Sequence, residues 1–214
     1  VIGYNHAPGE YIPFHLEEEL GLDDCVHGQN GCTSCTRACP RFRDWETEAD
    51  RHLFARERRP DEMSGVYKDI LLTRASDDAV HTVGQDGGLV SAILIWCLEN
   101  GVIDGALTSH LEHDGSWKAV PAVATDRESV LAGAGSRYTY SANTLAMPEA
   151  LDRGLSSLAL VGMSCQTPIG PVMWHRKVGK AGKPIKLNIG LLCSKSFDDA
   201  IFEELFWAKY RLRK

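Results

Sequence analysis

Three cysteines near the amino end have a spacing that can bind metal. Cys32, Cys35 and Cys39 form a C-x2-C-x3-C pattern, and Pro40 follows the last of them directly. This pattern is the closing part of the bacterial ferredoxin run, in which a short loop folds its thiolates around a 4Fe-4S cluster. A proline after the last ligand ends the helix and turns the chain away from the cluster. The spacing therefore predicts an iron-sulfur cluster in this loop.

The fourth ligand of such a cluster is open. The ferredoxin pattern would place a cysteine at position 29, where this chain has Gln29, and the next thiol upstream is Cys25. Cys25 could ligate through a longer spacer, a more distant group could complete the cluster, or the cluster could have three protein thiolates. We prefer Cys25. Zinc is the alternative metal, because Cys25 and the three loop cysteines, or His27 in place of one of them, would make a tetrahedral set.

Two further cysteines, Cys165 and Cys193, each follow an apolar, strand-like run. The carboxyl ends of parallel strands meet at one edge of a sheet, where α/β folds bind their ligands. With Gly162 and Gly190 close before them to open space, these two thiols are possible ligands of a second cluster. The alternative for each is simple packing, and two ligands do not complete a cluster. Cys97 lies within an apolar helical run and is expected to fill the core.

The number of cysteines indicates reduced thiols. The chain has seven, an odd number, and no signal-peptide pattern precedes them. A disulfide framework is therefore not expected, and persistent thiolates in a cytoplasmic protein are most often metal ligands or catalytic groups.

The net charge of −6 excludes a general nucleic-acid binder, which needs a basic surplus. A local basic stretch could bind an acidic partner or an anionic cofactor, or be a solvated loop: His175, Arg176, Lys177, Lys180 and Lys183.

Two polar segments have compositions that suit a phosphorylated aromatic cofactor. The first, Gly84-Gln85-Asp86-Gly87-Gly88, directly precedes an apolar helical run, and a helix amino end favours phosphate. A tight turn is the alternative. The second, Gly133-Ala134-Gly135-Ser136-Arg137-Tyr138-Thr139-Tyr140, offers a guanidinium for a diphosphate and aromatic side chains for an isoalloxazine or adenine ring.

The elements that must position these residues alternate along the chain. After a segment rich in Gly, Pro and Cys, a charged, exposed linker helix is expected over 44–59. Strand-like pieces follow at 69–73, 103–109, 117–124, 157–161 and 184–192, with helices at 87–99, 126–132 and 198–210. This alternation predicts an α/β fold with a mostly parallel or mixed sheet and helices on both faces. No apolar run reaches the roughly 20 residues needed to cross a bilayer.

Several motifs in a shared order resemble the coenzyme F420 hydrogenase/dehydrogenase beta-subunit family over about residues 30–200. They are Gly84-Gln85-Asp86-Gly87-Gly88-Leu89-Val90-Ser91, Ile103-Asp104-Gly105-Ala106, Gly135-Ser136-Arg137-Tyr138, Val161-Gly162-Met163-Ser164-Cys165-Gln166 and Gly190-Leu191-Leu192-Cys193. The chain departs from the family at Gln29, at Met163-Ser164, where Thr-Pro is usual, and at Leu192, where Phe is common.

The resemblance implies an FAD bound by the two polar segments, one or two 4Fe-4S clusters, and hydride exchange with coenzyme F420. Its cofactor-binding residues would be Gly84, Gln85, Asp86, Gly87, Gly88, Ser91, Gly135, Ser136, Arg137, Tyr138 and Thr139. Single electrons would pass to a redox partner subunit or a ferredoxin within a hetero-oligomer or homo-oligomer. No catalytic residue is assigned, because hydride transfer to a flavin needs no strong acid or base.

Two alternative functions remain. One is a ferredoxin-dependent flavoprotein reductase of the 7-hydroxymethyl chlorophyll reductase type, and the other is a non-catalytic, zinc-binding interaction module.

For the domain organisation we expect a small, ferredoxin-like iron-sulfur segment with its linker helix at 1–65. A flavin-binding α/β domain at 66–214 is expected to continue beyond the last residue of this sequence.

Overall fold

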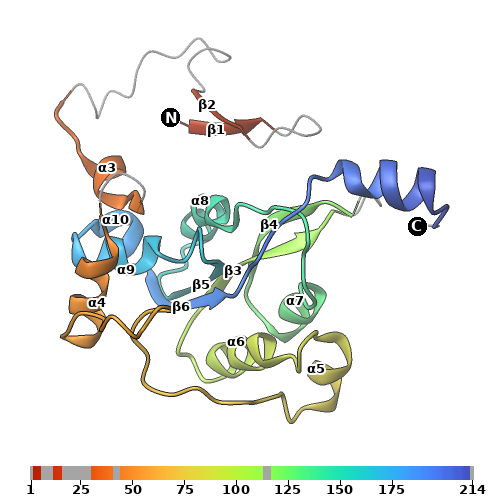
Figure 1. Ribbon diagram of the computed structural model, residues 1–214, viewed down its shortest axis with the longest axis horizontal. Coiled ribbons are helices and arrows are strands. Elements are labelled where there is room, and N and C mark those ends of the chain that lie inside the picture. The colour runs from red at the N-terminus through yellow and green to blue at the C-terminus, as the bar shows by residue number, and fades with distance from the viewer. Residues whose placement is uncertain (1, 6–11, 16–29, 41–43, 113–116, 213–214) are drawn as a thin grey trace.

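A four-stranded mixed sheet forms the centre of the molecule (Figure 1). The computed structural model describes residues 2–5, 12–15, 30–40, 44–112 and 117–212. The sheet order is β4-β3-β5-β6, with β3, β5 and β6 parallel and β4 antiparallel to β3 at one edge. The strands are β3 (Gly105–Leu111), β4 (Ala119–Ala124), β5 (Leu158–Met163) and β6 (Ile185–Leu191). The prediction of a mixed α/β sheet is confirmed.

Strand β5 shows why the sheet is covered on both faces. Its residues are apolar without interruption, and the first five are buried. Successive side chains point to opposite faces of a strand. Accordingly, Leu158 and Leu160 enter one core cluster, whereas Ala159 and Val161 enter the other. A continuous apolar run is typical of a strand with helices on both sides.

Three helices cover the first face: α5 (Asp78–Val83), α6 (Leu89–Glu99) and α7 (Arg127–Ala132). Asp77 caps α5 by accepting hydrogen bonds from the amides of Ala79 and Val80, and α7 begins with a capping box between Asp126 and Ser129. Cys97 of α6 is buried in this face's core, as predicted.

The second face is covered by a different set of helices. They are η2 (Asn143–Ala146), α8 (Met147–Asp152), α9 (Ile169–His175) and α10 (Gly179–Gly182). Their buried members Ala146, Ala150 and Met173 pack with Leu107 and Leu160 of the sheet. Residues 143–182 carry no strong sequence period, so these short helices were not predicted.

The amino-terminal part contains a hairpin and two helices. Strands β1 (Ile2–Asn5) and β2 (Ile12–His15) pair antiparallel. Helices α3 (Ser34–Ala38) and α4 (Glu46–Phe54) both contact α9. The helix expected within 44–59 is present as α4, but one side of it packs against α9 and is not exposed. Its Ala49 and Asp50 are buried, and Arg58 donates a 2.7 Å hydrogen bond to the Asp50 carboxylate.

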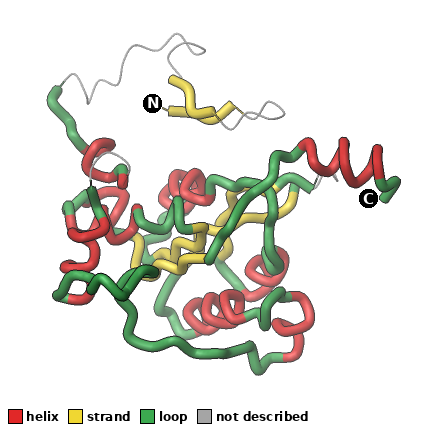
Figure 2. The backbone as a smooth tube through the Cα atoms, in the orientation of Figure 1, coloured by secondary structure: helices red, strands yellow, loops and turns green. Residues whose placement is uncertain are grey.

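The connection between α4 and α5 corrects a second expectation. It runs along the outside of the molecule without forming a strand (Figure 2). Residues 69–73 had been expected to be strand-like, but Ile70, Leu71 and Leu72 project outward, and the exposed fraction of Leu71 is 76%. Their apolar character was a misleading signal, because this segment pairs with none of the four sheet strands.

The chain ends in a helix that stands apart from the two layers. This helix, η3 (Ile201–Lys209), has wide π-helical turns and carries the end marked C in Figure 1. It lies within the range where a carboxyl-terminal helix was predicted. None of the helices in the described part of the chain has the length and apolar character needed to span a membrane.

Candidate functional site

The two polar segments singled out in the sequence lie side by side. The Ser136 backbone amide donates a 2.6 Å hydrogen bond to Gln85 Oε1, across 51 positions of sequence. Gln85 belongs to the glycine turn before α6, and Ser136 belongs to the segment that contains Arg137. The structure thus brings together the two segments that were assigned to one cofactor.

The glycine turn is tightly packed against its own chain. A Cβ on Gly84 would lie 2.5 Å from the Gly88 Cα, one on Gly87 would lie 2.9 Å from Arg74 Cβ, and one on Gly88 would lie 2.9 Å from the Val80 carbonyl oxygen. Asp86 also has a positive φ, 50°, which aspartate tolerates better than most residues. The tight turn considered as the alternative is therefore present. The phosphate-binding role of the same residues stays a prediction.

Helix α6 starts directly at the end of this turn. Gly88 is its N-cap, and no side chain caps the free amides of the first turn. Ser91, assigned from the family resemblance, is buried within this first turn. Free amides at a helix start carry partial positive charge and favour an anion.

Arg137 is the charged group of the site. Its Nη1 donates hydrogen bonds to the carbonyl oxygens of Ala134 and Gly135, at 3.3 and 3.2 Å. Its buried Nε has no hydrogen-bond partner within the part of the chain that the structure describes. Burial lowers the pKa of this guanidinium. An anionic ligand would compensate such a half-buried charge.

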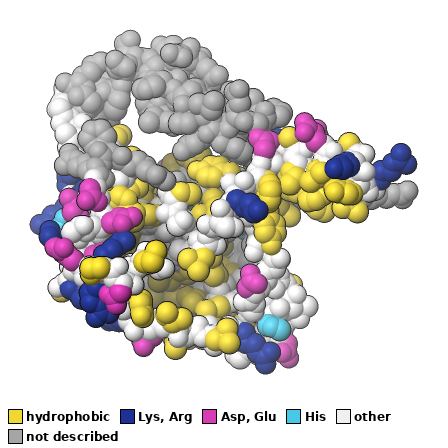
Figure 3. Space-filling model, viewed as in Figure 1, with side chains coloured by type: hydrophobic (Ala, Val, Ile, Leu, Met, Phe, Trp, Pro, Cys, Tyr) yellow, Lys and Arg dark blue, Asp and Glu magenta, His cyan; other side chains and the backbone are white. Residues whose placement is uncertain are grey.

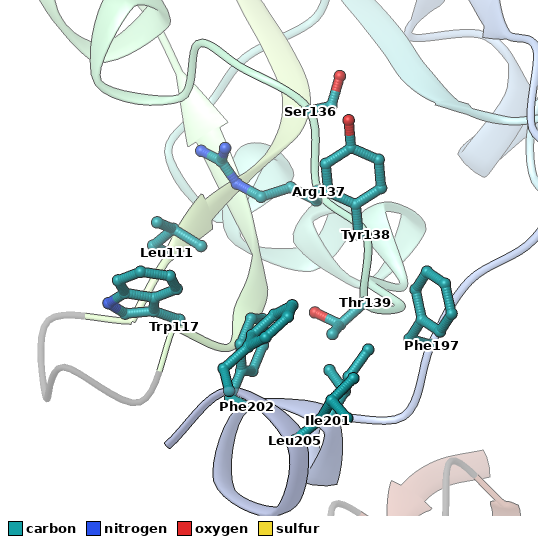
Figure 4. A pocket seen from close by; sticks show the side chains of 11 residues that line it. Leu111, Trp117, Ser136, Arg137, Tyr138, Thr139, Phe197, Ile201, Phe202 and Leu205 are labelled. Atoms are coloured by element: carbon teal, nitrogen blue, oxygen red, sulfur yellow. The ribbon is translucent and has the colours of Figure 1, made fainter. Parts of the chain in front are cut away.

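A cavity of about 510 Å³ opens beside Arg137 (Figure 4). The Arg137 side chain extends toward Leu111 and Trp117, whereas Ile201 and Phe202 face the same space from η3. The cavity is lined by residues of three segments, 111–117, 136–139 and 197–206. The lining residues are Leu111, Trp117, Ser136, Arg137, Tyr138, Thr139, Phe197, Ile201, Phe202, Leu205 and Phe206. The volume is in the range of small-molecule sites.

Sequence reasoning missed most of the walls of this cavity. Tyr138 was identified as a possible stacking residue, but Trp117, Phe197, Phe202 and Phe206 were not. The amphipathic pattern of 198–210 predicted a helix with one apolar face. It carried no information about which part of the fold that face would meet.

The cysteine loop forms one helical turn on the surface. The Cys39 amide donates a 3.0 Å hydrogen bond to the Cys35 carbonyl oxygen across α3. Cys32 and Cys35 are exposed, and Cys39 is half-buried. Hydrogen bonds with the Ser34 side chain and backbone lower the pKa of the Cys32 thiol, which favours the thiolate form that binds metal.

The ligand assignment in this loop stays a prediction. Over the ranges that the structure describes, no three His, Cys, Asp or Glu side chains converge in a metal-binding arrangement. Cys25, the preferred fourth ligand, lies outside the described residues, as do Gln29 and His27.

Two arginines attach the cysteine loop to the α/β body. Arg37 donates hydrogen bonds to the carbonyl oxygens of Arg176 and Lys177, and Arg176 Nη1 donates to those of Arg37 and Cys39. Arg176 also pairs with Glu48 of α4 at 2.9 Å, and its side chain is only 8% exposed. The basic stretch around Arg176 was expected to be either a binding patch or a solvated face. Arg176 instead forms contacts within the protein, between the end of α9, the cysteine loop and α4.

Cys165 and Cys193 follow neighbouring strand ends, as predicted. Met163 at the end of β5 pairs with Leu191 at the end of β6, and each cysteine lies two residues beyond and is exposed. The glycines before them have a different role from the one expected. A Cβ on Gly162 would lie 2.8 Å from Gln166 Oε1, and one on Gly190 would lie 3.3 Å from Thr167 Oγ1. The space is filled by the turn after β5, and metal binding by the two thiols stays a prediction.

The fold and this arrangement define a mixed α/β protein whose glycine turn and arginine segment meet beside a small-molecule cavity. Residues 70–147 match the family described as coenzyme F420 hydrogenase/dehydrogenase, beta subunit N-term. This match, similar proteins and a solved structure confirm the resemblance to the coenzyme F420 hydrogenase/dehydrogenase beta-subunit family that the motifs indicated.

Relatives with assigned names agree with this family. The chain is 33% identical over 141 residues to a coenzyme F420 hydrogenase subunit beta of Methanothermobacter thermautotrophicus, covering 62% of this chain and 48% of that protein. It is 32% identical over 205 residues to a coenzyme F420-dependent sulfite reductase of Methanocaldococcus jannaschii, covering 89% of this chain and 29% of that protein.

A solved structure shares the fold. It is a chain of the F420-reducing NiFe hydrogenase complex from Methanosarcina barkeri, with a TM-score of 0.55 and 28% identity, covering 61% of this chain and 47% of that one. The chain thus spans about half or less of the length of the relatives described here.

Proposed function

We propose that this chain is the FAD-binding part of an oxidoreductase that exchanges hydride with coenzyme F420 and passes single electrons to an iron-sulfur cluster. Two similar proteins are named as a coenzyme F420 hydrogenase subunit beta and a coenzyme F420-dependent sulfite reductase. The observation that carries the proposal is the hydrogen bond from Ser136 to Gln85, because it joins the glycine turn and the arginine segment into one site.

The residues of this joined site suit a dinucleotide with a diphosphate and an aromatic ring. Arg137 has a buried nitrogen without a partner, so a diphosphate or an anionic ring would satisfy it. The uncapped first turn of α6 offers amides to the same anion. Gln85 and Ser136 keep these two groups in a fixed relation. Bound FAD would supply the chemistry, because a flavin accepts two electrons as hydride and releases them singly.

The cysteine loop suits an iron-sulfur cluster by its donor set and its exposure. We assign Cys32, Cys35 and Cys39 as ligands with Cys25 as the fourth, and leave Cys165 and Cys193 as possible ligands of a second cluster. The three loop thiols lie at or beside one turn of α3, and Arg176 attaches this turn to the α/β body. A partner subunit would then receive electrons at the outward side of α3, where Cys32 and Cys35 are exposed.

An anaerobic preparation tests the function directly. We expect a coloured protein with about four irons and four sulfides per chain for one cluster, and one bound FAD. Reduced coenzyme F420 should bleach the flavin absorption. If only reduced ferredoxin bleaches it, the chain is a ferredoxin-dependent reductase. A colourless preparation that contains zinc but no sulfide or flavin would exclude both enzyme functions and would support the non-catalytic, zinc-binding module.

A pair of Gln85 variants tests the joined site itself. Gln85→Met keeps the length of the side chain but removes the acceptor for the Ser136 amide, and we expect FAD affinity to fall about tenfold or more. Gln85→Glu keeps the acceptor but adds a negative charge beside a diphosphate, so we expect it to lose FAD with little loss of stability. Asn100→Ala, at the exposed end of α6, is the control and should retain FAD. Unchanged FAD content in both Gln85 variants would contradict the assignment.

A further inference from the structure

Two histidines meet on the surface between α4 and α9. The ring centroids of His52 and His175 lie 5.5 Å apart, and the ring planes are inclined at 63°. His52 lies in the last turn of α4, and His175 is the last residue of α9. Both residues are exposed, and Figure 3 shows side chains of both charges gathered around α4 at the left edge of the molecule. Ions in the solvent can therefore reach this pair, which has no part in the proposed function.

The helices that carry the two histidines are held in a fixed relation. Helices α4 and α9 pack against each other. Arg176, the residue after His175, pairs with Glu48 of α4 at 2.9 Å, and the Arg176 side chain is only 8% exposed. The fold thus brings the two imidazoles together before any ligand binds. Such preorganisation lowers the entropic cost of binding a ligand that both rings share.

The separation of the rings suits one shared metal ion. Two imidazoles that bind one tetrahedral Zn²⁺ through nitrogens at about 2.0–2.1 Å have ring centres roughly 5 Å apart. The separation of His52 and His175 is close to this value. Because their ring planes are inclined, the planes intersect, and an ion on the line of intersection can lie in the plane of both rings. The alternative is a packing contact between the two rings without a ligand.

The charges beside the pair offset one another. Glu48 lies one helical turn before His52 on the same side of α4, and both bonds from Arg176 end on its Oε2. This carboxylate compensates the guanidinium, so a cation at the histidines does not meet an uncompensated positive charge.

The donor set favours a transition metal. Imidazole nitrogens suit Zn²⁺ and its neighbours in the first transition row, whereas Mg²⁺ and Ca²⁺ prefer oxygen ligands. Among the side chains that the structure describes, no three His, Cys, Asp or Glu donors converge. Two imidazoles would therefore be the protein ligands, and water would occupy the remaining positions.

We propose that His52 and His175 together bind one divalent transition-metal ion of the Zn²⁺ type, which bridges α4 and α9. This site shares no residue with the cysteine loop or with the cavity beside Arg137, and it does not depend on the proposed function. A bound ion would brace the two helices next to Arg176, whose bond to the Cys39 carbonyl oxygen helps to attach the cysteine loop.

Thermal unfolding of the anaerobic chain, with its cofactors bound, tests the site with Zn²⁺ as the probe. At about a hundredfold excess over the dissociation constant, Zn²⁺ should raise the melting temperature of the unaltered chain by about 5 °C or more. His52→Ala and His175→Ala should each lose most of this rise, and calorimetric titration should show Zn²⁺ affinity about tenfold or more weaker. His81→Ala, which removes an exposed histidine of α5, is the matched control and should keep the rise.

Each variant is compared with itself in the absence of Zn²⁺. A change in a variant's own stability therefore does not hide the effect of the ion, and the test remains decisive for a variant that is less stable.

The double variant tests whether the ion is shared. Because one bridging ion needs both imidazoles, each single variant and the double variant should lose the Zn²⁺-dependent rise to the same extent. Two separate, weak sites would instead lose it in additive steps. The inference is overturned by additive losses, by a rise that survives both substitutions, by an equal loss in His81→Ala, or by an unaltered chain that gains no stability from Zn²⁺.

Discussion

Arg37 and Arg176 each donate hydrogen bonds to the backbone carbonyl oxygen of the other. This exchange spans 139 positions of sequence and joins the cysteine loop to the end of α9. Arg176 additionally reaches the carbonyl oxygen of Cys39 and the carboxylate of Glu48. The position of the loop relative to the sheet therefore depends on a buried arginine as well as on any metal that the loop binds.

Removing Arg176 should detach the loop. Arg176→Met keeps much of the apolar side chain but leaves carbonyl oxygens and Glu48 without their donor, so we expect the free energy of unfolding to fall by about 2–3 kcal/mol. Denaturant unfolding measures this loss, and limited proteolysis should show faster cleavage near residues 30–60. Arg153→Met is the control, because its pair with Glu149 is exposed and should contribute at most about 1 kcal/mol. Equal losses in both variants would refute a special role for Arg176.

Removal of the Cys32 thiol and removal of the Cys97 thiol should have different effects on the cluster content of the protein. Cys32→Ala removes a proposed cluster ligand, and we expect most of the iron, the sulfide and the visible absorption to be lost. Cys97→Ala removes only a core side chain and should retain the cluster at a cost of about 1 kcal/mol in stability. Iron and sulfide counts on anaerobic preparations measure both. Identical spectra from the two variants would contradict the ligand assignment.

Glu62 predicts a defined pH dependence of stability. Arg56 donates two hydrogen bonds to this carboxylate, at 2.6 and 2.7 Å, and the Arg59 amide donates a third. These bonds lower the pKa of Glu62 from 4.5 to about 2. Because the folded protein favours the charged form, the contribution to stability is complete above pH 4.5 and is lost as the pH falls toward 2.

Thermal unfolding of Glu62→Gln against pH measures this contribution. The variant should melt at a lower temperature than the unaltered chain at neutral pH, and the difference should shrink as the pH falls from 4.5 to about 2. Glu57→Gln is the control, because the Arg51–Glu57 pair is more than half exposed on both sides. A constant difference across this pH range would count against the pKa shift.

The glycine turn provides a test of packing alone. Gly84 has an ordinary negative φ, so Gly84→Ala is penalised by lack of space, since its Cβ would meet the Gly88 Cα at 2.5 Å. We expect a loss of about 1–3 kcal/mol from overpacking. Gly179→Ala has nothing within 4 Å of its Cβ and should be neutral or slightly stabilising. Chemical denaturation compares the two, and a neutral Gly84→Ala would show that the turn can open.

Local sequence patterns predicted much of the architecture. The apolar run of β5 predicted a strand covered on both sides, and the run after Gly88 predicted α6, because periodicity reports which faces of an element are buried. The glycine turn, the arginine segment and the family motifs were recognised from their local residue types. Backbone geometry at a turn restricts residue type locally, so these motifs are visible without any knowledge of the fold.

Other features depended on contacts between distant parts of the chain. Apolar residues at 69–73 suggested a strand, but a strand needs a free sheet edge, and no local pattern shows whether one is available. The antiparallel direction of β4, the exchange between Arg37 and Arg176, and the cavity between Trp117 and Phe202 are likewise long-range. An amphipathic pattern states that a face will be buried, and only the folded chain decides against what.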